Sequence, residues 1–162
     1  MQIDLVEVDY RNTRQTDDLF NLLNEYAAEP MGGGASLDED SKETILAGLR
    51  SFPTSFSLLI YADGKPAALA NCFFGFSTFA ARKLVNIHDL MVSRPFRGKG
   101  MSQMLLDRIE KIAIENNCCK MTLEVLSNNH VAQNSYRKFG FAGYELDPTA
   151  GEALFWQKKL GE

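Results

Sequence analysis

The chain has 162 residues, 45% of them hydrophobic and 23% charged, which suits one globular domain spanning residues 1–162. Its net charge of −4 argues against nucleic acid or an anionic membrane as a partner. No apolar run approaches about 18 residues and the first residues do not resemble a signal peptide, so we expect a cytoplasmic protein. Cys72, Cys118 and Cys119 lack metal-ligand spacing, so we expect reduced thiols and no metal site.

The first half of the sequence predicts a strand, two helices and a hairpin. Apolar alternation predicts a strand at 2–8, and helical spacing predicts a helix at 13–28. The run MGGGAS follows, either as a flexible connector or as a mobile lid. Ser36 and Glu39 have the spacing of a capping box for a second helix, which ends at Pro53. Asp63-Gly64 between two apolar runs predicts a hairpin.

The second half predicts further strands that alternate with helices. A strand at 84–92 precedes a helix at 100–117, and a strand at 120–126 precedes a short helix that ends at Gly140. The last run, ALFWQKKL at 153–160, predicts a terminal strand. The strand–helix–strand segment is long enough for a parallel crossover, whereas the hairpins must be antiparallel. The expected fold class is therefore α/β, with a mixed sheet covered by helices.

Basic residues and glycines gather in SRPFRGKGMS, between a strand and a helix. The run fails the Walker A pattern, and Gln103 stands where a Rossmann fingerprint needs a third glycine. Glycines let a ligand approach the backbone, and the first amides of a helix lack internal partners and attract anions. The run therefore predicts a phosphate site; the alternative is a plain glycine turn beside solvated basic residues.

The same run resembles a signature of the GNAT superfamily of N-acetyltransferases, Arg-x-x-Gly-x-Gly/Ala, with Ser102 at the final small position. A second run resembles the superfamily's downstream signature through Asn129, Ala132, Tyr136 and Gly140-Phe141. The resemblance covers about residues 84–141. It implies a mostly antiparallel sheet with one central parallel crossover, flanked by about four helices.

The resemblance also implies a site for acetyl-CoA as co-substrate. The loop would hold the pyrophosphate, and the backbone of the preceding strand, bulged away from the next parallel strand, would hold the pantetheine arm. Tyr136 matches the position that protonates the departing thiolate; the alternative is a half-buried packing residue. The implied cofactor-binding residues are Leu90, Met91, Val92, Arg97, Gly98, Lys99, Gly100, Met101, Ser102, Asn129 and Tyr136.

Residues 74–93 look most like the diamine and thialysine acetyltransferases, which usually carry Glu-Asp where this chain has His88-Asp89. A histidine can act as a base near neutral pH, so His88 is a candidate catalytic base. The alternatives are a water chain as base and a strand histidine bonded within the sheet. Several aromatic residues either line an acceptor pocket or belong to the core, namely Phe74, Phe76, Phe79, Tyr144 and Trp156.

These observations predict an enzyme that transfers the acetyl group of acetyl-CoA to a primary amine of a small molecule. The amine would be diamine-like or amino-acid-like, and it would attack directly in a ternary complex. By resemblance, we expect a homodimer. The alternatives are a protein lysine or N-terminal acetyltransferase, and a non-catalytic module that binds acetyl-CoA as a sensor.

Overall fold

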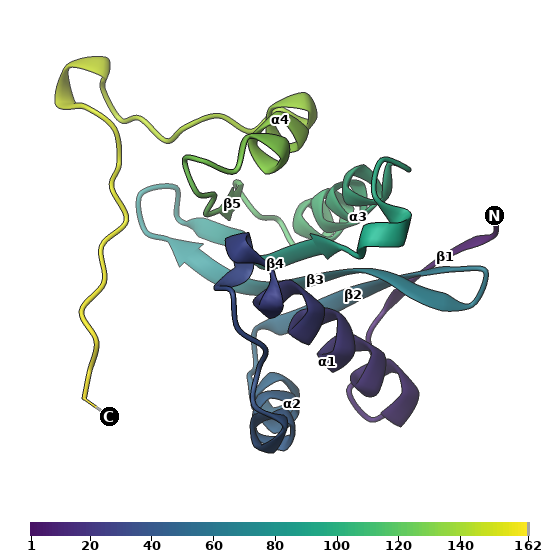
Figure 1. The fold of residues 1–162 in the computed structure, drawn as a ribbon. Helices are drawn as coiled ribbons and strands as arrows, with labels where there is room; N and C mark the ends of the chain where they lie inside the picture. Colours follow the sequence, from purple (N-terminus) through teal and green to yellow (C-terminus); the bar gives the residue numbers. More distant parts are fainter. Residues whose placement is uncertain (162) are drawn as a thin grey trace.

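A computed structural model describes residues 1–161 and contains one mixed sheet (Figure 1). The strands lie in the order β1-β2-β3-β4-β5, and only β4 and β5 are parallel. This confirms the predicted mostly antiparallel sheet with a single parallel crossover. The strand bounds are β1 (Ile3–Glu7), β2 (Ser55–Ala62), β3 (Lys65–Ser77), β4 (Arg82–Val92) and β5 (Met121–Leu123).

Helices cover both faces of the sheet. Figure 1 shows α1 (Thr13–Ala28) and α2 (Lys42–Ser51) on one face, and α3 (Met101–Glu115) and α4 (His130–Phe139) on the other. Alternate residues of β2 enter two separate core clusters: Leu58 packs on the α3 side and Leu59 on the α1 side. Burial of both faces explains why β2 is a nearly continuous apolar run. Within residues 1–161, no helix is both long and apolar enough to cross a membrane.

Local signals fix most element ends as predicted. Asn12 caps α1 by accepting from the amide of Gln15 at 3.2 Å. Gly140 ends α4 at a φ of 113°. Asp63-Gly64 turns β2 into β3 with both φ angles positive, at 49° and 75°.

The predicted capping box at Ser36 is wrong. The chain enters α2 through a 3₁₀ turn at Glu39–Ser41, which Asp38 caps by accepting from the amide of Asp40. Just before that turn, the amide of Leu37 donates to Asn24 Oδ1 at 2.6 Å, which holds this segment against α1. The helix therefore begins at Lys42, later than the spacing predicted.

The predicted strand at 153–160 is also wrong. Residues 142–161, called here the C-terminal arm, contain no strand and run away from the body (Figure 1). The arm bends at a 3₁₀ turn, Pro148–Ala150, which Asp147 caps. An extended segment becomes a strand only when a neighbouring strand shares a series of backbone hydrogen bonds with it. Among the described residues, the second half of the arm makes one backbone hydrogen bond, from the amide of Ala153 to the carbonyl of Tyr144 at 3.4 Å.

Candidate active site

The strand β4 carries a bulge at His88. Ile87 pairs with Cys72 and Asp89 pairs with Asn71, so His88 has no partner on β3. The ring of His88 meets the edge of Phe73 at 5.4 Å, and Asp89 Oδ2 accepts from Asn71 Nδ2 at 2.9 Å. Asn71 and Phe73 stand two residues apart on β3 and so share a face. The bulge thus turns two consecutive polar side chains toward the same side of the sheet.

Beyond the bulge, β4 has an open edge. Its pairing with β5 covers only Val85, Asn86 and Ile87. The amide of Ser93 donates to the carbonyl of Ala67 on β3, at 2.9 Å. Because backbone groups alternate along a strand, Met91 also faces β3, whereas Leu90 and Val92 point their amides and carbonyls toward the open side.

Two of the three strand residues expected at the cofactor therefore offer their backbone to a ligand. Arg97 Nε donates to the carbonyl of Val92 at 2.9 Å. The groups that remain for a ligand are the amides of Leu90 and Val92 and the carbonyl of Leu90. Met91 does not share this role, because its backbone faces β3 and its side chain lies in the core under α1. Residue spacing alone does not reveal which backbone groups face the open side, since the bulge shifts the alternation along β4 by one residue.

The glycine loop supplies a second set of donors. Gly98 and Gly100 have φ angles of 74° and 80°, in the left-handed region that favours glycine. Among the described residues, the backbone amides of residues 98–103 have no hydrogen-bond acceptor. A Cβ at either glycine would meet no atom within 4 Å, so the space in front of the loop is open. Free amides at the start of α3, with its dipole behind them, suit a phosphate group.

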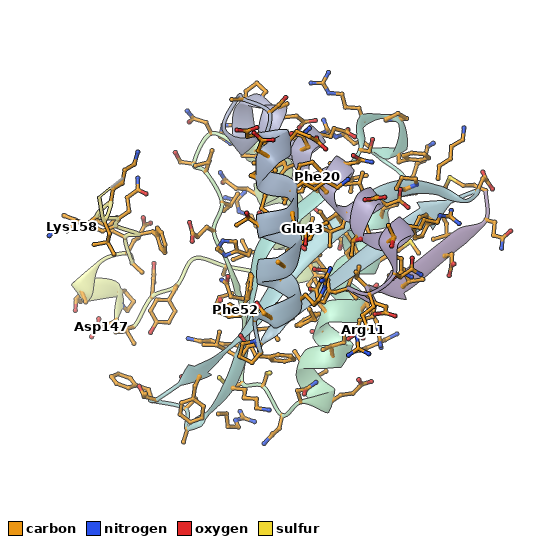
Figure 2. The ribbon with its side chains drawn as sticks, turned by 90° about the horizontal axis from the view of Figure 1, so that it is seen from below. Arg11, Phe20, Glu43, Phe52, Asp147 and Lys158 are labelled. Atoms are coloured by element: carbon orange, nitrogen blue, oxygen red, sulfur yellow. The ribbon has the colours of Figure 1, made fainter. Side chains whose placement is uncertain are left out.

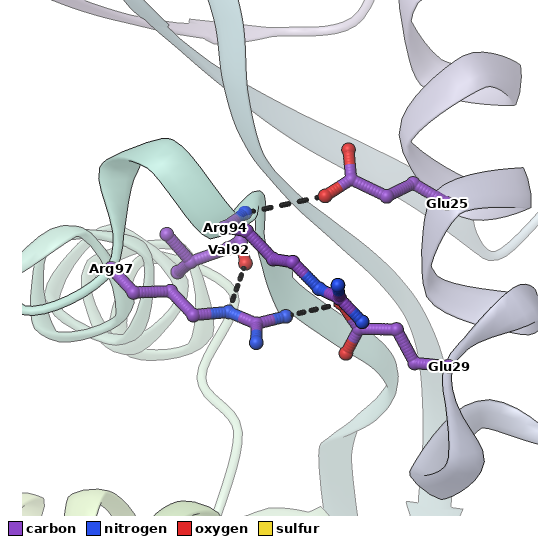
Figure 3. Close-up of polar contacts among 5 residues, drawn as sticks. All are labelled: Glu25, Glu29, Val92, Arg94 and Arg97. Atoms are coloured by element: carbon purple, nitrogen blue, oxygen red, sulfur yellow. Dashed lines mark hydrogen bonds and ion pairs between the residues drawn. The ribbon is translucent and has the colours of Figure 1, made fainter.

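Arg97 holds the loop in place rather than pointing into that space. Figure 3 shows its guanidinium between the carbonyl of Val92 and the carboxylate of Glu29, where Arg97 Nη2 lies 2.5 Å from Oε1. Arg94 reaches the same carboxylate at 3.4 Å and donates its amide to Glu25 Oε1 at 3.2 Å. Both arginines therefore tie the loop to the last turn of α1.

The other loop residues expected to bind the cofactor turn their side chains to contacts within the protein. Lys99 Nζ donates to the carbonyl of Pro95 at 3.1 Å and keeps to the edge of the loop. Met101 is buried, so it offers only its amide. Ser102 Oγ lies 3.1 Å from Ser135 Oγ and joins α3 to α4 instead of facing a ligand.

Asn129 likewise has a structural contact. Its Oδ1 accepts from the amide of Ala132 at 3.2 Å, so the side chain caps α4. The cap sets where α4 begins, and Tyr136 lies on that helix two turns later.

Tyr136 lies at the edge of the core, with its ring 5.9 Å from that of Phe141. Burial raises the pKa of its hydroxyl to about 12, and the nearby Tyr26 adds to that shift. Burial also raises the pKa of Tyr26, and the carboxylates of Asp89 and Glu29 raise it further. Tyr26 is therefore close enough to interact with each of the other three groups.

The sequence does not reveal the contribution of α1 to the site. Tyr26 fits the apolar stripe of a helix, and Glu29 has the composition of a solvent-facing helix end. The structure makes Glu29 the shared partner of two arginines, with only 15% of its side chain exposed. The triple glycine packs closely against the end of α1. A Cβ on Gly32 would lie 1.9 Å from the carbonyl oxygen of Tyr26, and the amide of Gly34 donates to the carbonyl of Ala27.

A buried polar chain holds Asp89. Tyr10 Oη lies 2.8 Å from Ser57 Oγ, Ser57 donates to Asn71 Oδ1 at 2.6 Å, and Asn71 donates to Asp89. Ser57 and Asn71 are buried, so each relies on these bonds to satisfy its polar atoms. Asp89 is thereby fixed, whereas His88 beside it is exposed and, among residues 1–161, has only Asn86 Oδ1 within hydrogen-bond distance, at 3.4 Å.

An open strand edge that leads to free helix-start amides is a site for an extended ligand that carries phosphate. The chain belongs to the acetyltransferase (GNAT) family, whose model matches residues 16–141. This confirms the resemblance, and it identifies a member of an acyl-transferring enzyme family.

Two curated relatives are acetyltransferases. The chain is 32% identical to the streptothricin acetyltransferase of Streptomyces lavendulae over 114 residues, which are 70% of this chain and 56% of the relative. It is 26% identical to the thialysine N-epsilon-acetyltransferase of Bos taurus over 68 residues, which are 42% of this chain and 39% of the relative. The matches thus span less than two thirds of either relative.

The fold is shared along the whole chain. The structure of AAC(6')-Iy in complex with the bisubstrate analog CoA-S-monomethyl-acetylneamine superposes with a TM-score of 0.76 at 15% identity. The superposition covers 99% of this chain and 100% of that one, which confirms the fold class.

Proposed function

We propose that the protein transfers the acetyl group of acetyl-CoA to a primary amine of a small molecule. The observation that carries this proposal is the open edge of β4, where the free amides of Leu90 and Val92 lie between the bulge and the glycine loop. The names of both curated relatives support an amine acceptor.

The chain's own groups suggest how acetyl-CoA would be held. The amides of residues 98–103 suit its pyrophosphate, and the backbone of Leu90 and Val92 suits an extended pantetheine arm. Bound in this way, the thioester supplies an activated acyl group. The amide of Leu90, which faces the open side, is the proposed donor to the oxyanion that forms when an amine attacks.

The attacking amine must first lose a proton. An alkylammonium with a pKa near 10.4 costs about 4 to 5 kcal/mol to deprotonate at pH 7, so a base or a water chain is required. His88 is the proposed base, because the bulge turns its exposed ring to the same side as Asp89. Asp89, fixed by Asn71, gives this side a negative charge that favours a cationic acceptor.

The thiolate of CoA is the leaving group, and Tyr136 is the proposed donor to it. Its raised pKa keeps the hydroxyl protonated throughout the physiological range. An acceptor with a second charged or polar group, diamine-like or amino-acid-like, fits the carboxylate of Asp89 best. The free thiols agree with a reducing, cytoplasmic setting.

A panel of amines tests the proposal by the release of free CoA. The panel contains diamines, amino acids, an aminoglycoside, and peptides with a free lysine or N-terminus. We expect the highest kcat/KM for a small amine with a second cationic group. Peptides as the best substrates would favour a protein acetyltransferase, and binding of acetyl-CoA without turnover of any amine would favour a sensor module.

A further inference from the structure

Asn86 lies two residues before His88 on β4 and contacts both that histidine and the next strand. Its Nδ2 donates to Thr122 on β5, to Oγ1 at 3.2 Å and to the carbonyl oxygen at 3.5 Å. Its Oδ1 lies 3.4 Å from Nδ1 of His88. Asn86 and Thr122 are also partners in the parallel pairing of the two strands. The side chain of Asn86 therefore connects the candidate base to β5.

The contact with Thr122 decides which way the amide group of Asn86 faces. A backbone carbonyl can only accept a hydrogen bond, so the nitrogen of the amide group must face it, whichever way the hydroxyl of Thr122 points. The amide oxygen then faces His88, and it too can only accept. The neutral ring must therefore carry its proton on Nδ1, which leaves a lone pair on Nε2.

Other contacts agree with a fixed ring. Phe73 meets the ring of His88 edge to face, with 5.4 Å between centroids, and Phe52 meets Phe73 in the same way at 5.2 Å. Figure 2 shows Phe52 at the C-terminal end of α2, so the ring is supported from that helix as well as from β3. Among the described residues, Asp89 bonds to Asn71 and not to this ring, so it does not compete for the ring proton.

We propose that Asn86 is a positioning residue, which holds the proton of neutral His88 on Nδ1 so that Nε2 is the atom that deprotonates the acceptor amine. This inference rests on the proposed function, in which His88 is the base. In the transfer, an N–H bond of the ammonium group breaks and a bond from Nε2 to that proton forms, which leaves a neutral amine and an imidazolium. The imidazolium still donates from Nδ1 to Asn86, so the contact persists before and after the transfer.

Nitrogen NMR of protein with isotope-labelled histidine reads the ring directly, because a nitrogen that carries a proton and one with a lone pair have well-separated resonances. The chain has two histidines, and His130 is exposed on α4 and serves as an internal reference. At about pH 9, where neutral imidazole predominates, we expect His88 in the form with the proton on Nδ1. The opposite form in the wild-type protein would overturn the inference.

Two variants of similar size separate the acceptor from the shape of the side chain. Asn86→Leu removes the acceptor and should give a mixture of both forms of His88, whereas Asn86→Asp keeps an acceptor and should retain the proton on Nδ1. Circular dichroism checks that both variants fold. An Asn86→Leu protein in which the proton stays wholly on Nδ1 would show that Asn86 does not place it.

Kinetics connect the position of the proton to the reaction. We expect kcat/KM to fall about 2- to 12-fold in Asn86→Leu, which corresponds to about 0.5 to 1.5 kcal/mol for one neutral hydrogen bond, and to recover in Asn86→Asp. The dissociation constant of acetyl-CoA should not change. A changed NMR spectrum with unchanged kcat/KM would refute the positioning role. The spectrum does not depend on turnover, so a wild-type protein that acetylates no amine refutes the proposed function, whereas a wrong spectrum with normal turnover refutes this inference alone.

Discussion

Replacing Tyr136 by Phe tests the proposed leaving-group donor while it preserves the fold. The ring packs against Phe141 at the edge of the core, and no hydrogen bond of its hydroxyl to another described residue needs replacing. The variant should therefore keep its melting temperature and its affinity for acetyl-CoA. Only a step that uses the hydroxyl should change.

The pKa of Tyr136 sets the size of that change. Burial raises this pKa to about 12, whereas an alkyl thiol has a pKa near 8.5. Complete transfer of the proton to the thiolate would then be uphill by roughly 5 kcal/mol. A buried phenol is therefore better suited to donate a hydrogen bond to the developing thiolate than to lose its proton. Hydrogen bonds to charged groups contribute about 1.5 to 3 kcal/mol, so kcat should fall by roughly 10- to 150-fold.

Three measurements on one preparation check this prediction: kcat from CoA release, the dissociation constant of acetyl-CoA, and the melting temperature. A loss of kcat beyond about 10³-fold would refute the hydrogen-bond magnitude and indicate full general-acid catalysis. Unchanged kcat with a lower melting temperature would make Tyr136 a packing residue. Solvent would then protonate the thiolate.

Four other predictions follow from named contacts. Gly100→Val should fill the open space before the loop and weaken acetyl-CoA binding, measured by calorimetry, more than about tenfold. The control Gly64→Val is equally strained, at a φ of 75° in the β2–β3 turn, and should leave the affinity unchanged. Equal affinities of the two variants would exclude the loop as the pyrophosphate site. If His88 is the base, kcat/KM should rise with pH through an ionisation that His88→Ala removes, and an unchanged profile would assign the base to water or another residue. Glu29→Gln should raise the KM for acetyl-CoA several-fold with little change in kcat, because it releases both arginines that tie the loop to α1. An unchanged KM would mean that the ion pairs of Glu29 with Arg94 and Arg97 have a structural role only. The pKa of Tyr136 is raised above its unfolded value near 10, so the protonated hydroxyl stabilises the native state. The urea midpoint of unfolding should therefore fall as pH rises from about 10 to 12, and it should fall less in Tyr136→Phe.

Local chemistry explains the features that the sequence could predict. A left-handed glycine before a helix, the Asp63-Gly64 turn and the Gly140 helix end each depend on neighbouring residues only. The glycine loop could be found for the same reason, since its free amides follow from where α3 begins.

The features that could not be predicted depend on contacts between distant segments. The resemblance implied a bulge in this strand, but its position at His88 comes from the register between β3 and β4, which no residue in the strand marks. It decides that Leu90 and Val92, rather than Met91, offer their amides to a ligand. The role of Glu29 depends on two arginines 65 and 68 residues away along the chain.

The arm shows why a correct local pattern can still give the wrong element. Apolar and polar residues alternate along 153–160 as in a strand. Such alternation indicates only that one face tends to be buried, and it does not indicate which surface buries it. Within one chain, the turn at Pro148–Ala150 and the direction of the first half lead the segment away from the sheet. The pattern therefore predicts the local conformation of the segment, whereas its pairing depends on where the preceding turn directs the chain.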